Sequence, residues 1–84
     1  MEMFELYEEF IAELYGFQKL KDDIRNRYFN KYDNHYMTLY KYDDLYTLTI
    51  QNNSGGFSIE NSDKDLSKLL TEGLDFIEMG VNDG

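Results

Sequence analysis

The sequence predicts an α+β fold with a long N-terminal helix, a three-stranded antiparallel sheet and a C-terminal helix (αβββα). Three observations lead to this prediction. Apolar residues recur at helical steps of three and four up to about residue 29, and they alternate with polar residues from Tyr36 to Gln51. A run of turn formers at residues 52–56 follows, after which helical spacing returns. The 84 residues are too few for more than one domain, which spans 1–84.

The first helix is expected from about residue 2 to about residue 29. Its apolar residues at helical spacing are Met3, Leu6, Tyr7, Phe10, Leu14, Phe17, Leu20, Ile24 and Tyr28. Basic residues gather between Lys19 and Lys31, where the helix macrodipole favours cations. Gly16 is the weak point, because an interior glycine costs about 1 kcal/mol relative to alanine. It could therefore divide the segment into two helices.

The next segment predicts a hairpin with a two-residue turn at Asp43 and Asp44. This register pairs Tyr42 with Leu45, Tyr40 with Thr47 and Thr38 with Thr49, so that Tyr36, Tyr40 and Tyr42 share one face with the threonines. The opposite face is the better core face, and it carries Met37, Leu39, Tyr46, Leu48 and Ile50. A register slip of one residue would exchange the two faces.

A short third strand is expected at 57–60, with Phe57 and Ile59 pointing inward. Ser62 then reads as the N-cap of the last helix, which Gly80 would end. The apolar positions of this helix are Leu66, Leu69, Leu70, Leu74 and Ile77.

Seventeen acidic residues against eight basic ones give a net charge of -9. Such a chain repels nucleic acids and anionic lipids and attracts basic surfaces, so we expect neither a nucleic acid nor a membrane as its direct partner. It contains no cysteine, and glutamates stand where a secretory signal would carry cations. We therefore expect a cytoplasmic protein.

No motif for catalysis is found. His35 is the only histidine and has no cysteine beside it, so neither a zinc site nor a cysteine–histidine pair can be assembled. Gly55 and Gly56 lack the lysine of a phosphate-binding loop, and the serines stand in no nucleophile motif. We expect no enzyme activity, no cofactor and no bound metal.

Acidic residues occur where helix energetics do not favour them. Glu5, Glu9 and Glu13 repeat at four-residue steps near Glu2 and Glu8, although like charges at this spacing each cost a few tenths of a kcal/mol. Asp75 and Glu78 lie near the negative end of the last helix, and Asp43 and Asp44 lie at the hairpin tip. One interpretation is a surface that presents carboxylates to a cationic groove, since four helical residues rise about 6 Å, close to twice the roughly 3.4 Å step of a DNA strand. The other is a solvated face that favours solubility.

Two further patterns allow two interpretations each. Tyr36, Tyr40 and Tyr42 are residues of the type that anchors protein interfaces, but cross-strand tyrosine and threonine pairs also simply stabilise sheets. The basic run from Lys19 to Lys31 could bind nucleic acid, but we prefer a role at the helix C-terminus, with Asp23 pairing to Arg27 four residues later.

In size, acidity, lack of cysteine and order of elements, the whole chain resembles small phage-encoded inhibitors of nucleic-acid enzymes: anti-CRISPR proteins, anti-restriction proteins and the uracil-DNA glycosylase inhibitor. No diagnostic motif carries the resemblance. It implies a stoichiometric inhibitor, first of all an anti-CRISPR protein, that binds the basic DNA-binding surface of a nuclease or other DNA-processing enzyme by DNA mimicry. The residues expected to contact this partner are Glu2, Glu5, Glu9, Glu13, Tyr36, Tyr40, Tyr42, Asp43, Asp44, Asp75 and Glu78.

Two alternatives remain open at this point. The first is an immunity or antitoxin-like protein that neutralises one partner toxin. The second is a regulatory module that self-associates through the tyrosine face. The sequence does not decide the oligomeric state.

Overall fold

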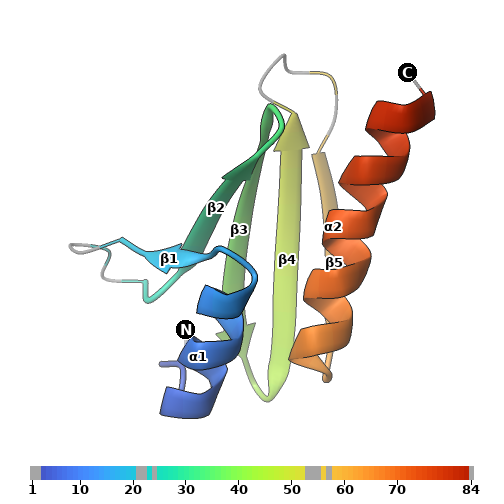
Figure 1. Ribbon diagram of the computed structural model, residues 1–84. Coiled ribbons are helices and arrows are strands. Elements are labelled where there is room, and N and C mark those ends of the chain that lie inside the picture. Colours follow the sequence, from blue (N-terminus) through green and yellow to red (C-terminus); the bar gives the residue numbers. More distant parts are fainter. Residues whose placement is uncertain (1–2, 21–22, 24, 53–55, 57, 84) are drawn as a thin grey trace.

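The computed structural model describes residues 3–20, 23, 25–52, 56 and 58–83, and their side chains up to Met79. A five-stranded antiparallel sheet in the order β1-β2-β3-β4-β5 carries two helices on one of its faces (Figure 1). The elements are α1 (Leu6–Leu14), β1 (Gln18–Lys19), β2 (Tyr28–Tyr32), β3 (His35–Tyr42), β4 (Leu45–Asn52), β5 (Ser58–Asp63) and α2 (Leu66–Asp83). The α+β class is as predicted, but the three-stranded sheet is wrong.

The prediction of one helix up to residue 29 is wrong beyond Leu14. Gly16 has φ +88°, a left-handed conformation that glycine adopts readily just after a helix. The Gly16 amide donates to Glu13 O at 3.0 Å, and the Phe17 amide donates to Ala12 O at 3.0 Å. These two bonds satisfy the last carbonyls of the helix, and the chain then leaves in an extended conformation as β1.

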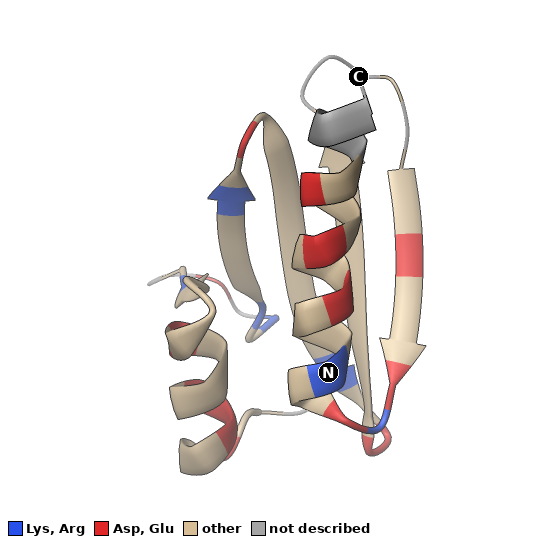
Figure 2. Cartoon of the chain, turned by 45° about the vertical axis from the view of Figure 1, so that its right-hand side comes forward, with Lys and Arg blue, Asp and Glu red and all other residues tan. Residues whose placement is uncertain are grey.

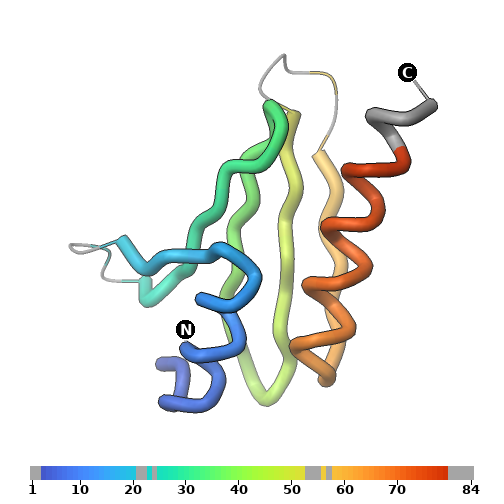
Figure 3. The backbone as a smooth tube through the Cα atoms, in the orientation of Figure 1, coloured from blue at the N-terminus to red at the C-terminus, as the bar shows by residue number. Residues whose placement is uncertain are grey.

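β1 and β2 are the two strands that were not predicted, because the helical periodicity of this segment concealed a turn signal. β2 pairs with β3 through a two-residue turn at Asp33 and Asn34, whose φ angles are 49° and 65°. Asp43 and Asp44 form the same kind of turn between β3 and β4, with φ angles of 53° and 66°. Positive φ at both positions is typical of the type I′ hairpin, and Asp and Asn tolerate it better than most residues. The two turns lie at opposite ends of the sheet (Figure 3).

The predicted register of the central hairpin is confirmed. Tyr42 pairs with Leu45, Tyr40 with Thr47 and Thr38 with Thr49. The five residues predicted for the core face are all buried: Met37, Leu39, Tyr46, Leu48 and Ile50. Alternation over two eight-residue strands was enough to fix this part of the fold.

The last strand is longer than predicted, and the last helix begins later. Ser62 belongs to β5, where it pairs with Thr47, so it is not the N-cap. Asp65 caps the helix instead, because its Oδ1 accepts the Lys68 amide at 3.1 Å. The helix continues through Gly80 to Asp83, so the predicted end is also wrong. Ile59 is half-buried, whereas Phe57 lies outside the described residues.

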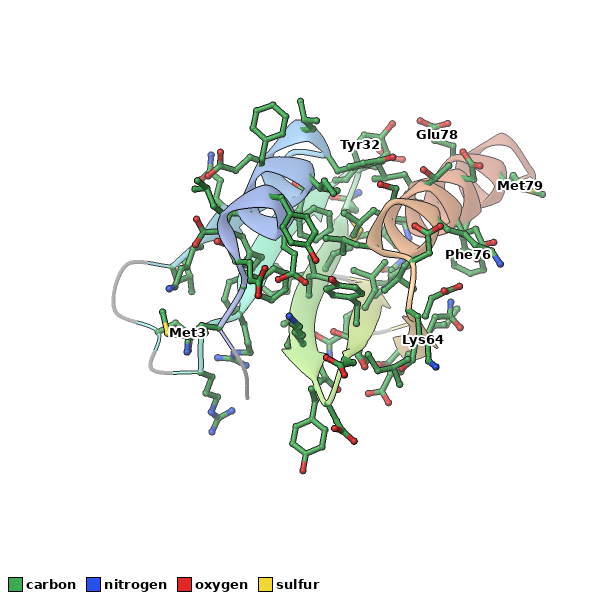
Figure 4. The ribbon with its side chains drawn as sticks, turned by 90° about the horizontal axis from the view of Figure 1, so that it is seen from below. Met3, Tyr32, Lys64, Phe76, Glu78 and Met79 are labelled. Carbon is green, nitrogen blue, oxygen red and sulfur yellow. The ribbon has the colours of Figure 1, made fainter. Side chains whose placement is uncertain are left out.

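The core fills the space between the two helices and the sheet face beneath them. Its buried apolar residues are Phe4, Ala12, Phe17, Tyr28, Met37, Leu39, Tyr46, Leu48, Ile50, Leu66, Leu69, Leu70 and Ile77. All the apolar positions predicted for α2 contribute, Leu74 being partly buried. The opposite face of the sheet has no helix over it in the described part of the chain (Figure 4).

Gly73 sets how closely α2 approaches β4. A Cβ atom built at this position would lie 2.4 Å from Leu48 Cδ2, and Leu48 is only 1% exposed. Alanine normally stabilises a helix interior by about 1 kcal/mol relative to glycine. Here we expect Gly73→Ala to lower the free energy of unfolding by about 1–3 kcal/mol because the core is overpacked. Chemical denaturation measures this, and adding Leu48→Ala should relieve part of the loss caused by Gly73→Ala; a stabilised single variant would contradict the close approach.

Candidate interaction surfaces

The orientation of α1 differs from the one that its amphipathic pattern suggests. The side chains that face the sheet from this segment are Phe4, Glu8 and Ala12, which are all buried. The exposed side carries large apolar residues, with Leu6 82%, Phe10 63% and Leu14 68% exposed. The helical spacing of these three residues therefore does not reflect burial against the sheet.

Glu8 is held in the interior by polar partners. Its Oε1 accepts the Glu5 amide at 2.7 Å and the Lys41 ammonium at 3.1 Å, and the Tyr46 hydroxyl donates to Oε2. Burial alone would raise the pKa of Glu8, but the hydrogen bonds from Tyr46, Glu5 and Lys41 together hold the pKa below its usual value. Burial and the Glu8 carboxylate also raise the pKa of Tyr46. We call Glu8, Lys41 and Tyr46 the buried polar cluster.

Removing the cation of this cluster should be costly. Lys41→Met leaves the Glu8 carboxylate buried without its counter-ion, and breaking such a pair costs about 3 kcal/mol or more. We expect the free energy of unfolding to fall by about that amount in denaturant titrations. The matched control is Glu8→Gln/Lys41→Met, in which a neutral amide still accepts hydrogen bonds from Tyr46 and Glu5. Equal losses for the single and the double variant would contradict an electrostatic origin.

The lowered pKa of Glu8 also predicts a pH dependence of stability. A carboxyl group whose pKa is lower in the folded state binds protons more tightly when unfolded, so it stabilises the fold above its unfolded pKa. This contribution disappears as the pH falls through the folded pKa. We expect the stability difference between wild type and Glu8→Gln to shrink from pH 6 toward about pH 3. Thermal unfolding at several pH values measures it, and a difference that grows on acidification would contradict the prediction.

The predicted acids of α1 do not form one uniform solvent-exposed row. Glu5 and Glu13 are exposed, but Glu9 is half-buried and is directed to the sheet, where its hydrogen bond helps to raise the pKa of Tyr28. Burial is the larger cause of that shift. Glu2 lies outside the described residues. The acidic edge of α1 therefore runs along the side that faces β2.

Three acids of α2 are exposed. Glu72, Asp75 and Glu78 follow one another at three-residue steps. The first turn of α2 contains no acidic residue, and its last turn contains no basic residue. Figure 2 shows them as red bands on α2, with the basic Lys68 in the first turn of the helix. Glu78 Oε1 accepts the Tyr32 hydroxyl at 2.9 Å, and this bond raises the pKa of Tyr32.

The hairpin tip is a separate acidic group. Asp43 and Asp44 are exposed at the end of the sheet opposite to the C-terminal end of α2 (Figure 1). The structure thus places the predicted acids in three groups and brings no two groups into direct contact among the described residues.

The predicted tyrosine face exists as the uncovered side of the sheet. Tyr42 is 65% exposed, and Tyr36 and Tyr40 are half-buried. The ring of Tyr36 lies 5.6 Å from that of Phe29, and the guanidinium of Arg27 lies 5.1 Å from the Phe29 ring centre. Residues Phe29 and Arg27 were not predicted to join this face, because they were assigned to the first helix.

The basic run does not lie in a helix. Asp23 and Arg27 do form the predicted pair, with Arg27 Nε 3.2 Å from Asp23 Oδ2, but they lie in the connection between β1 and β2. The Asp23 carboxylate also accepts the amides of Arg25 and Arg27. These bonds, with the Arg27 side chain the largest cause, lower the pKa of Asp23 to about 2.

The sequence did not lead us to expect the apolar surface of α1. Leu6, Tyr7, Phe10 and Leu14 are each at least 60% exposed, and we call these four residues the apolar stripe. Tyr7 also lines a cavity of about 440 Å³ between α1 and the start of α2. The available signal was that apolar residues cover more of the helix circumference than a single buried face requires. Met3, labelled in Figure 4, is also exposed, but it precedes α1 and is not part of the stripe.

Neither a metal site nor a membrane span is found in the part of the chain that the structure describes. No group of three histidine, cysteine or carboxylate residues there is arranged to hold an ion. No helix there is both long and apolar enough to cross a bilayer.

The comparisons with known proteins found no match: no family model fits the sequence, and no curated protein or solved structure is significantly similar to it.

Proposed function

We propose that this protein is a stoichiometric inhibitor of the anti-CRISPR kind, which occupies the basic DNA-binding surface of a DNA-processing enzyme. The observation that carries the proposal is the exposed series Glu72, Asp75 and Glu78 on α2, in a chain of net charge -9. Carboxylates that repeat along a straight, rigid element can replace the phosphates that such a surface normally binds.

Two features of the fold support this role. α2 is an eighteen-residue helix anchored by buried leucines, so its acids keep fixed relative positions. Their repetition at three-residue steps is unfavourable for the helix itself, because like charges on neighbouring helical positions repel each other, and each such pair costs a few tenths of a kcal/mol. A charge pattern that stability does not select is consistent with selection for binding.

The predicted contact residues have different places in the proposed binding surface. Asp75 and Glu78 belong to the central binding series together with Glu72. Glu5 and Glu13 extend the acidic surface on α1, whereas Glu9 is engaged with Tyr28. Asp43 and Asp44 would contact a second part of the partner, because they lie at the other end of the sheet.

The test is displacement of labelled duplex DNA from a CRISPR effector nuclease, a restriction endonuclease and uracil-DNA glycosylase, followed by fluorescence anisotropy. We expect the protein to release DNA from at least one enzyme at a 1:1 ratio, with affinity that falls steeply as salt is raised. Glu72→Gln/Asp75→Asn/Glu78→Gln should abolish most of this competition.

A charge-matched control separates local recognition from net charge. Asp33→Asn/Glu60→Gln/Asp65→Asn removes the same number of carboxylates, so both triple variants change the net charge of -9 by three units. Asparagine is acceptable in the turn at 33 and as a helix cap at 65. Competition that is lost equally in both variants, or that is absent with all three enzymes, would contradict DNA mimicry by α2.

A further inference from the structure

The apolar stripe on α1 exposes more hydrophobic surface than an isolated small domain normally tolerates. Tyr7 is 60% exposed and Phe10 is 63% exposed. An aromatic side chain has a surface area of about 150–250 Å² that can be buried. With Leu6 and Leu14 added, the stripe reaches several hundred Å² on a helix of nine residues. Contiguous apolar patches of this size mark interaction sites in soluble proteins.

Acidic residues border the stripe on one side. Glu5, Glu9 and Glu13 follow one edge, which is turned toward β2, as the Glu9–Tyr28 contact indicates. The other edge faces α2, to which α1 is joined by the bond between Tyr15 Oη and Thr71 Oγ1 at 2.9 Å. On this edge, the pocket that Tyr7 lines is also lined by Asp63, Lys64 and Asp65, so charges of both signs lie there. Glu78 is bonded to Tyr32 near the β2–β3 turn, and Phe76 and Met79 point away from α1 (Figure 4). An apolar centre with a charged rim is the usual anatomy of a protein interface.

The charges disfavour a second copy of this chain as the occupant. A two-fold axis that relates antiparallel α1 helices places both Glu5–Glu13 edges on the same side of the pair, so like charges line up. An axis that relates parallel helices separates these edges, but two copies that each carry a net charge of -9 still repel each other.

We propose that the apolar stripe is the docking site for an amphipathic helix of the partner protein, with basic residues on one flank of its own apolar face. Leu6, Phe10 and Leu14 form a ridge at four-residue steps, the kind that packs between the ridges of a second helix. The lysines or arginines of that helix meet the acidic edge of α1. The basic character of the partner rests on the proposed function, whereas the helical form of the contact rests on the apolar ridge of α1.

A synthetic helix of leucine and lysine tests the recognition directly. The probe is an 18-residue peptide with leucines along one helical face and lysines elsewhere; a scrambled peptide of identical composition is the control. We expect the amphipathic peptide to bind 1:1 in titration calorimetry and to shift the amide resonances of α1 more than those of the hairpin tip. The scrambled peptide should bind about tenfold more weakly or not at all.

Variants locate the binding energy on the stripe. Leu6→Gln/Phe10→Gln removes two exposed side chains while keeping good helix formers, and it should weaken peptide binding by about tenfold or more. The matched control, Phe76→Gln/Met79→Gln, removes exposed apolar groups from the far side of α2 and should leave the affinity unchanged. Circular dichroism establishes that both variants fold.

Three results would overturn the docking site. They are equal affinities for the two peptides, equal losses in the two double variants, and a concentration-dependent dimer in sedimentation equilibrium that Leu6→Gln/Phe10→Gln abolishes. The last result would assign the stripe to a second copy. Because no enzyme takes part, failure here leaves the DNA-displacement result standing, and failure of that assay leaves the peptide result standing.

Discussion

A carboxylate enclosed between a short helix and a sheet controls how this domain presents its surface. Glu8 is completely buried and is held by the Lys41 ammonium, the Tyr46 hydroxyl and the Glu5 amide. These partners lie on β3, on β4 and at the start of α1, so the cluster fixes the rotation of the helix about its axis. A rotation that buried Phe10 instead would move the charge out of its hydrogen bonds, or leave them unmade in the interior, which costs several kcal/mol.

As a consequence, α1 buries less apolar surface than it could. Each large apolar side chain transferred from water to the core stabilises a fold by about 1.5–3 kcal/mol, and α1 leaves four of them at least 60% exposed. A buried ion pair, in contrast, contributes little net stability compared with apolar residues of the same volume. The buried polar cluster therefore specifies orientation at the expense of burial. Such an exchange is understandable if the exposed apolar stripe is needed for binding.

The parts of the fold that sequence predicts well are those where pattern and local chemistry agree. The β3–β4 hairpin combines alternation over sixteen residues with a turn at Asp43–Asp44 that accepts positive φ, so its register could be derived. The segment from Phe17 to Tyr32 was misread because Leu20, Ile24 and Tyr28 happen to continue the helical spacing. Gly16 and the Asp33–Asn34 pair were the contrary signals, and both proved decisive. Periodicity over a few residues cannot outweigh a left-handed glycine and a type I′ turn.

Individual site residues could be predicted, but their environment could not. Asp23 and Arg27 were recognised as a pair from their spacing, although the pair braces a turn. Glu8 was grouped with the surface acids because nothing local distinguishes it from Glu5 or Glu9. Its counter-ion, Lys41, comes from a strand 33 residues away, and such a contact is determined by tertiary packing alone.

The charged and apolar surfaces of the helical layer have complementary physical roles in the proposed binding. Long-range attraction between the acidic rim and a basic partner raises the rate of encounter and orients the two proteins, but salt screens it and it adds little to the lifetime of a complex. Apolar side chains act only at contact, where their burial slows dissociation. A binding surface made of acids alone would dissociate readily from any one basic groove and would distinguish poorly between grooves. The apolar stripe beside the acids supplies the short-range complementarity that makes one partner preferred over others of the same charge.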